Sequence, residues 1–182
     1  MHNELYSTLA GKATQSEPQL AGPRKAAVSI ILDSRDLPRT LLIKRAERSG
    51  DPWSGQIAFP GGKFQEGDRT ARDTAARETL EEVGIDLGTN ADFLGYFQPF
   101  RTHTGVMDVV PALFLLRSPV TVRINEEVTS YRWVDLKKLV SDESKVSYRL
   151  NFGGEPREVP AYRVEDYMIW GLTHRIISDL VA

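Results

Sequence analysis

The sequence contains no cysteine in its 182 residues. This absence excludes a disulfide framework, thiol chemistry and a zinc site with thiolate ligands. No apolar stretch approaches the roughly 20 residues that a membrane-spanning helix needs. The N-terminal residues also lack the charged start and the apolar run of a secretory signal. We therefore expect a cytoplasmic protein without a membrane partner.

An excess of charge of either sign is also missing. Lysine and arginine number 23 and aspartate and glutamate 25, for a formal net charge of −2, and no basic stripe is interleaved with aromatic residues. Nucleic acid is therefore not an expected partner. The length suits one domain and is short for two. We expect residues 25–182 to form that domain, and residues 1–24 to form an arm or a short helix docked through Leu5, Tyr6 and Leu9.

An acidic helix is the most informative stretch. The pattern predicts a helix from Thr70 to Val83, ended by Gly84, which can adopt the left-handed backbone conformation. At 100° per residue, Glu78, Glu81 and Glu82 fall within one third of the helix circumference. We expect these carboxylates to project together, away from the face that packs on the protein core.

Two further sets of side chains complete this helix. The face opposite the carboxylates, which we expect to be buried, carries Ala76, Leu80 and Val83. One turn before the carboxylates, small residues would leave room for a metal-bound ligand: Ala71, Thr74 and Ala75. Neighbouring like charges cost about 0.2–0.5 kcal/mol per pair on a helix, and Mg²⁺ or Mn²⁺ would turn that repulsion into binding. The charge pattern alone also fits a solvated acidic surface.

The residues around this helix resemble a known motif. The backbone at Pro60-Gly61-Gly62 is free of bulk and can approach a ligand closely. With Asp68, Arg77-Glu78, Glu81-Glu82, Gly84 and Ile85, the glycines resemble the Nudix box, Gly-x5-Glu-x7-Arg-Glu-U-x-Glu-Glu-x-Gly-U, where U is bulky and aliphatic. Asp68 replaces the early glutamate, with eight residues rather than seven between it and Arg77, and Thr79 replaces the first U. The longer box resembles that of the coenzyme A pyrophosphatases.

The segment before the box carries the same resemblance. It begins with Leu-Leu-x-Lys-Arg at residue 41 and ends with Gly-Gln-x-x-Phe-Pro-Gly-Gly at residue 62, as in the coenzyme A pyrophosphatases. Trp53 stands where that subgroup has a histidine, either as an aromatic at the edge of the core or as a surface on which a base stacks. Arg45 and Arg48 fit either a solvated strand end or charge-assisted binding of substrate phosphates.

The resemblance implies a fold and a reaction. The fold is a Nudix-type α/β/α sandwich with a mixed β-sheet. The reaction is the metal-dependent hydrolysis of the diphosphate linkage in a nucleoside diphosphate joined to a second group, X. Coenzyme A or its esters are the expected substrates, and ADP-ribose or a nucleotide sugar is the alternative, to which Pro99 points. A catalytically silent nucleotide sensor is the rival reading, which the retained carboxylates disfavour.

The resemblance also implies a role for each candidate residue. Mg²⁺ or Mn²⁺ would be held by Glu78 and Glu82, with Glu81 and the carbonyl of Gly62 completing the shell. Arg77 would orient a carboxylate. The general base stays open among Glu127, Glu81 and Glu78, with Glu126 as the substitute for Glu127. Substrate binding would involve Arg45, Arg48, Gly61, Gly62 and His103.

Elsewhere the sequence predicts further elements. We expect Ala26–Leu32 and Thr40–Lys44 to form a long hairpin. Other expected elements are strands at 93–97, 109–116 and 131–134, a helix at 136–140 capped by Asp135, an irregular or hairpin insert at 141–161, and a C-terminal helix containing Ile169, Leu172, Ile176 and Leu180. Monomer and homodimer both remain open.

Overall fold

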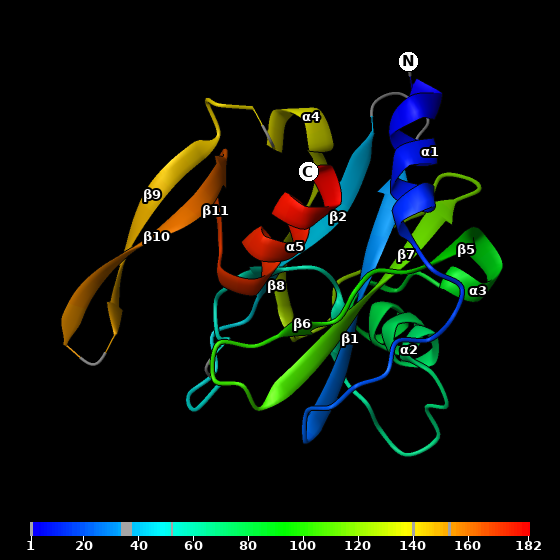
Figure 1. The fold of residues 1–182 in the computed structure, drawn as a ribbon, viewed down its shortest axis with the longest axis horizontal. Coiled ribbons are helices and arrows are strands. Elements are labelled where there is room, and N and C mark those ends of the chain that lie inside the picture. The colour runs from blue at the N-terminus through cyan, green and yellow to red at the C-terminus, as the bar shows by residue number, and fades with distance from the viewer. Residues whose placement is uncertain (1, 34–37, 52, 140, 153) are drawn as a thin grey trace.

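The computed structural model describes residues 2–33, 38–51, 53–139, 141–152 and 154–182 (Figure 1). The side chains of Leu5 and Tyr6, which we expected to dock an N-terminal helix, lie outside the described part. In chain order the elements are α1 (His2–Lys12), β1 (Arg24–Asp33), β2 (Arg39–Arg45), β3 (Ile57–Ala58), β4 (Gly61–Lys63), α2 (Ala71–Val83), α3 (Leu87–Asn90), β5 (Ala91–Tyr96), β6 (Phe100–Arg101), β7 (Met107–Leu116), β8 (Val128–Asp135), α4 (Leu136–Leu139), β9 (Lys145–Phe152), β10 (Glu155–Val164), β11 (Tyr167–Trp170) and α5 (Gly171–Val181).

The main sheet is mixed and has β1 at its centre. Its strands run in the order β3-β2-β1-β7-β5, while β4 pairs with β1, β6 with β7 and β8 with β2. Strands β1 and β7 are parallel, and the other pairings are antiparallel. Pairing of Ala27 with Gly62 and of Val28 with Gly61 lays the glycine segment along β1. This register sets where the glycine backbone meets the acidic helix.

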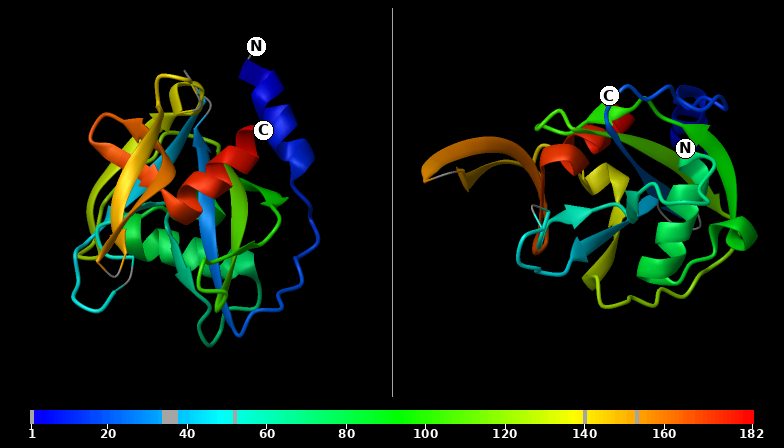
Figure 2. Two further views of the ribbon diagram at one scale, coloured as in Figure 1. Left: turned by 60° about the vertical axis from the view of Figure 1, so that its left-hand side comes forward. Right: turned by 90° about the horizontal axis from the view of Figure 1, so that it is seen from below.

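Side chains of β1 alternate between two apolar clusters on opposite faces of the sheet, as the two-residue period of a strand requires. Ile30 packs in one cluster with Leu9 of α1 and Ile176 of α5. Ile31 packs in the other with Ala75 of α2. Helices therefore cover both faces of a mixed sheet (Figure 2), and the predicted α/β/α sandwich is confirmed.

The two predicted strands form and pair as a hairpin, but the hairpin is short and not long. Strands β1 and β2 pair only at Leu32 with Thr40 and at Asp33 with Arg39, and β2 then continues along β8. The reason is that β4 occupies the same edge of β1 further along, so β2 must diverge. Apolar alternation identifies both strands but does not specify their partners.

The C-terminal region differs from expectation at its start. The insert is a hairpin of β9 and β10, which β11 extends into a second, three-stranded sheet. The hairpin projects from the body (Figures 1 and 2). Ile169 lies in β11 and not in the helix, because α5 begins at Gly171, whose positive φ of 65° turns the chain. Ile176 and Leu180 lie on the buried face of α5, as predicted.

The remaining short elements agree with the sequence. The carboxylate of Asp135 accepts the backbone N–H of Lys137 at 2.8 Å, which caps α4. The predicted last residue of that helix, Val140, lies outside the described residues. In the part of the chain that the structure describes, no helix has the length and apolar character needed to cross a membrane.

Candidate active site

Helix α2 has the predicted boundaries. Thr70 is its N-cap and forms a capping box with Asp73, while Gly84 ends it in the left-handed conformation with a φ of 70°. Asp73 Oδ2 accepts the Thr70 backbone N–H at 3.1 Å, and Thr70 Oγ1 accepts that of Asp73 at the same distance. The helix is therefore fixed at both ends by its own sequence.

The prediction of which face of α2 is buried is only partly confirmed. Val83 is buried and Ala76 is half-buried against the core, as predicted. Leu80, however, is 51% exposed, whereas Glu78 and Glu82 are 8% and 1% exposed. The small residues pack α2 closely on β1: Ser29 Oγ donates to the Ala75 carbonyl at 3.0 Å and accepts Thr79 Oγ1 at 2.8 Å. Ala71, Thr74 and Ala75 are thus buried against the sheet and leave no room for a ligand. Close packing turns two of the carboxylates inward.

Two glycines of β4 allow the carboxylates to approach the sheet. The Gly61 backbone N–H donates to Glu82 Oε2 at 2.8 Å. A Cβ atom at Gly62 would lie 2.5 Å from the carboxylate carbon of Glu78, a distance that no side chain tolerates. The glycines therefore place two acidic side chains directly on the backbone of β4.

Burial controls the electrostatics of these carboxylates. It raises the pKa of the Glu82 carboxyl to about 8, and the Gly61 N–H and Arg45 oppose that rise. Burial is also the main cause of the raised pKa of Glu78, although Arg77 lowers it. The charge of Glu127 raises both pKa values further. The three carboxylates therefore repel one another, and each makes ionisation of the others less favourable.

Such a set of carboxylates fits a hard divalent cation, because added positive charge would offset the burial and the mutual repulsion. In the described segments, however, no three acidic or histidine side chains already form a metal cluster. Glu78, Glu82 and Glu127 would have to move together to coordinate one ion. Glu81 is half exposed and directed at Arg77 Nη1, 3.4 Å away.

Arg77 connects the box acids. Its guanidinium donates to both carboxylate oxygens of Asp68 at 3.1 and 2.9 Å, to Glu78 Oε1 at 2.8 Å and to the Lys63 carbonyl at 3.0 Å. The Arg77 contacts lower the pKa of Asp68 to about 2. The shorter acid and the additional residue in the box thus produce a bidentate partner for Arg77, which holds Glu78 in place.

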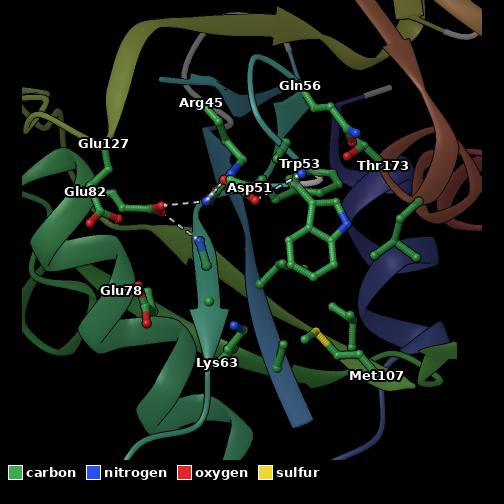
Figure 3. Close-up of a pocket in the computed structure, with 18 of the residues that line it drawn as sticks. Arg45, Asp51, Trp53, Gln56, Lys63, Glu78, Glu82, Met107, Glu127 and Thr173 are labelled. Atoms are coloured by element: carbon green, nitrogen blue, oxygen red, sulfur yellow. Dashed lines mark hydrogen bonds and ion pairs between the residues drawn. The ribbon is translucent and has the colours of Figure 1, made fainter. Parts of the chain in front are cut away.

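The acidic side chains border a cavity of about 610 Å³. Figure 3 shows Glu78, Glu82 and Glu127 on one side and Trp53 and Met107 on the other. Gly61 and Gly62 contribute to the lining, so most predicted site residues meet in one place. This volume is typical of small-molecule sites.

The predicted substrate residues divide into two groups. Arg45 and Arg48 line the cavity, where Arg45 is 3.2 Å from Asp51 and 3.6 Å from Glu82, and Arg48 is 3.3 Å from Glu127. His103 is exposed between β6 and β7 and is not among the residues that line the cavity. The structure therefore does not bring His103 to the carboxylates.

The sequence reasoning missed Lys63, which also lines the cavity. The position of Lys63 directly after the two glycines indicates a place in the cavity lining only when the pairing of β4 with β1 is known. Trp53 packs on Ala26, Met107 and Val109, as expected of an aromatic at the edge of the core. It also lines the cavity, and stacking of a base on it stays a prediction.

Comparison with known proteins agrees with this geometry. The profile of the NUDIX domain matches residues 23–151. Nudix hydrolase 22, chloroplastic, of Arabidopsis thaliana is 33% identical in an alignment of 165 positions, which covers 85% of this chain and 53% of that protein. The chain thus spans about half the length of this relative. An uncharacterized Nudix hydrolase NudL of Yersinia pestis is 33% identical over 92% of this chain and 83% of its own.

The solved structures agree in fold. A MutT/nudix family protein from Enterococcus faecalis superposes with a TM-score of 0.57 and 20% identity, over 92% of this chain and 63% of that one. Similarity at this level of identity concerns the arrangement of helices and strands alone.

Proposed function

The chain belongs to the Nudix hydrolase family, and on that premise we propose that it hydrolyses the diphosphate linkage of a nucleoside diphosphate joined to a second group, X. One product would be a nucleotide and the other a phosphorylated X. The observation that carries the proposal is the burial of Glu78 and Glu82 against the glycine backbone of β4, at the wall of a cavity large enough for a nucleotide.

The residues present suit a Mg²⁺ or Mn²⁺ ion, held by Glu78 and Glu82 with help from the Gly62 carbonyl. Such an ion neutralises phosphate oxygens and acidifies the attacking water. Arg77 keeps Glu78 oriented through its 2.8 Å contact. We assign the general base to Glu127, because it lines the cavity, whereas Glu81 is not among the lining residues.

An unpaired donor on Arg45 supports a role of this residue in phosphate binding. Its Nε is a buried nitrogen without a hydrogen-bond partner among the described residues. A buried donor left unpaired costs roughly 1–3 kcal/mol, and a phosphate oxygen would supply its partner. Arg48 and Lys63 add positive charge around the same cavity.

Coenzyme A or its esters are the substrates that we favour. Support comes from residues 41–62 and from the lengthened box, both of which resemble the coenzyme A pyrophosphatases. ADP-ribose or a nucleotide sugar is the alternative, because Trp53 departs from the subgroup pattern. A silent sensor is disfavoured because Glu78, Glu81 and Glu82 are all present.

The decisive experiment is a panel assay with Mg²⁺ or Mn²⁺ and coenzyme A, ADP-ribose, a nucleotide sugar and a nucleoside triphosphate, with chromatographic separation of the products. Adenosine 3′,5′-bisphosphate as the dominant product is the expected result. AMP or another nucleoside monophosphate would support the alternative substrates. A folded protein that turns over none of them would overturn the proposed catalysis in favour of a sensor.

A further inference from the structure

The hairpin of β9 and β10 leaves one edge of the second sheet open. That sheet runs in the order β11-β10-β9, so β9 is an edge strand, and no other strand of the described residues pairs with its outer side. The hairpin also projects from the body of the molecule (Figures 1 and 2). An unpaired strand edge presents a row of backbone N–H and C=O groups, which is a template for pairing with another strand.

Two prolines block the opposite edge of the hairpin. The Arg163 backbone N–H donates to the Ser144 carbonyl at 2.8 Å, which places the hydrogen-bonded pairs of the ladder at every second residue from Ser144. Pro160 faces Ser147 in an intervening pair, whose backbone groups point outward, and Pro156 occupies the same kind of pair four residues earlier. Because proline has no N–H, the outer edge of β10 lacks donors that the outer edge of β9 keeps.

One face of β9 carries a row of apolar side chains. Val146, Tyr148 and Leu150 alternate along the strand, and each is half-buried. Val159 of β10 stands opposite Tyr148, and the Trp170 ring centroid lies 6.2 Å from that of Tyr148. Because this row lies on the edge strand, a second strand added there would bury more of its apolar surface.

The other face of β9 carries two cations. Lys145 and Arg149 are exposed on it, with Ser147 between them. Lys145 Nζ lies 2.8 Å from an Asp142 oxygen, while Glu158 of β10 accepts Ser147 Oγ at 3.2 Å and Arg149 Nη2 at 3.4 Å. Exposed ion pairs of this kind are weak, so two such cations placed directly opposite each other on neighbouring strands would still repel.

These cations restrict how two copies of β9 can pair about a two-fold axis. Antiparallel pairing centred on Arg149 would oppose that residue to itself, and pairing centred on Ser147 would oppose Arg149 to Lys145. Pairing centred on Tyr148 avoids both conflicts. It places Ser147 opposite Arg149, aligns the two apolar rows, and sets the two Tyr148 side chains against each other. Registers shifted further leave more of the strand unpaired.

We propose that the outer edge of β9 binds the same edge of a second copy of this chain, antiparallel and centred on Tyr148. The two three-stranded sheets then form one continuous sheet across a two-fold dimer. A single strand pair is a small interface, so the dimer is expected to dissociate on dilution. No residue of β9 is among those that line the cavity, so this dimer is independent of the proposed catalysis.

Sedimentation velocity of the full chain over a series of micromolar concentrations is the first test, and a reversible monomer–dimer equilibrium is expected. Ser147→Pro removes an outward N–H from β9 but keeps the ladder to β10, because the pair of Ser147 with Pro160 contains no hydrogen bond. The dissociation constant of the dimer should therefore rise about tenfold or more, since each copy leaves a carbonyl of its partner unpaired.

Ser147→Ala is the matched control. It loses the hydroxyl contact with Glu158 but keeps the backbone N–H, so it should dimerise like the unsubstituted protein. A monomer at every concentration would overturn the proposal and leave the edge to a strand of another protein. A dimer that Ser147→Pro leaves unchanged would also overturn it, since the two copies would then meet on another face.

A cysteine at the two-fold axis tests the register without a proline. The chain contains no cysteine, so Tyr148→Cys introduces a single thiol. Facing residues of a pair without hydrogen bonds have Cα atoms about 4.5 Å apart, which a disulfide can span. Mild oxidation should therefore join two copies of Tyr148→Cys, as measured by non-reducing electrophoresis.

Val159→Cys is the control for the register. Val159 lies on the same apolar face as Tyr148 but one strand further from the axis, so the two Val159 positions would be about 14 Å apart and too distant for a disulfide. Equal yields of disulfide from the two variants would contradict pairing at Tyr148. The same conclusion would follow if Tyr148→Cys formed none at concentrations where the unsubstituted protein is a dimer.

Discussion

Glu82 shows how one residue serves two opposed demands. Its carboxylate is 1% exposed and raised in pKa to about 8 by burial, yet the proposed chemistry needs it as an anion beside a cation. Folding therefore bears a desolvation cost at this position that a neutral side chain would avoid. Such a residue is expected where function and not stability determines the side chain.

The first prediction concerns Glu82→Gln. We expect kcat to fall roughly a thousandfold or more, because an anionic metal ligand is lost. The melting temperature should stay equal or rise, since Gln keeps an acceptor for the Gly61 N–H without a buried charge. Initial rates and thermal melts of both proteins would measure this. Near-normal turnover would contradict the assignment of Glu82 as a ligand.

The second prediction concerns Gly62→Ala. The new Cβ would collide with the Glu78 carboxylate at 2.5 Å, so Glu78 must move. We expect turnover to fall at least tenfold and Mn²⁺ to bind more weakly, measured by kinetics and calorimetry. Gly11→Ala is the control, because a Cβ at Gly11 meets no atom within 4 Å. Equal activity in both variants would contradict the claim that catalysis needs the Glu78 carboxylate in its position beside Gly62.

At the residue scale the sequence predicted the box acids and Arg77 but not their surroundings. Helical spacing brings Glu78 and Glu82 together, yet it does not reveal that they face the sheet. That outcome depends on Ser29, which lies far away in the chain and binds α2 through Thr79. Lys63 was missed for the same reason, since its direction depends on pairing with β1.

Among the elements, the segment before β1 is held by one aspartate. Asp108 Oδ2 of β7 accepts the backbone N–H groups of Ala21 and Gly22 at 3.0 and 2.6 Å, and Asp108 Oδ1 accepts Arg101 Nε at 2.8 Å. Arg101 and then the Gly22 N–H lower the pKa of Asp108 to about 2 from a usual 3.8. The ionised form of Asp108 therefore anchors three segments of chain.

The third prediction follows from that pKa. Because the pKa is depressed in the folded state, the stabilisation is complete above about pH 4 and is lost as the pH falls towards 2. At pH 7, Asp108→Asn should lower the free energy of unfolding by roughly 1–3 kcal/mol. The difference between the two proteins in urea unfolding should disappear near pH 2. A difference that is constant with pH would contradict an electrostatic anchor.

The elements also mark the limits of reading apolar patterns. A spacing of i, i+3, i+7 placed Ile169 in the C-terminal helix, but Ile169 is in β11, since a buried strand residue can match a helical position by coincidence. Helix boundaries were predicted better, because Thr70 and Gly84 end α2 through local chemistry alone. Pairing of β2 with β8 is non-local and left no signature near either strand.

In the whole molecule, β4 pairs with β1 and α2 packs on β1, and this common packing brings Gly62 to Glu78 and Glu82. A cation held by these three residues would therefore bind only the folded state. The fourth prediction is that Mn²⁺ raises the melting temperature. The free energy of unfolding should increase by about 1.4 kcal/mol for each tenfold excess of Mn²⁺ over its dissociation constant. Scanning calorimetry with Mn²⁺ or EDTA measures this effect. Glu82→Gln should respond much less, and an equal response in both would place the ion elsewhere.

The parallel pairing of β1 with β7 has a consequence during synthesis on the ribosome. Arg24 pairs with Met107 and Leu32 with Leu115, so the central strand meets its longest partner only after roughly 80 further residues have been added. At about 5–20 residues per second, this delay lasts roughly 4–16 s. Although α1, β2, β4 and α2 precede β7 and can already contact β1, the edge of β1 that pairs with β7 has no strand partner during this time. An open strand edge can pair with another chain, so the nascent domain is most prone to aggregate in this interval.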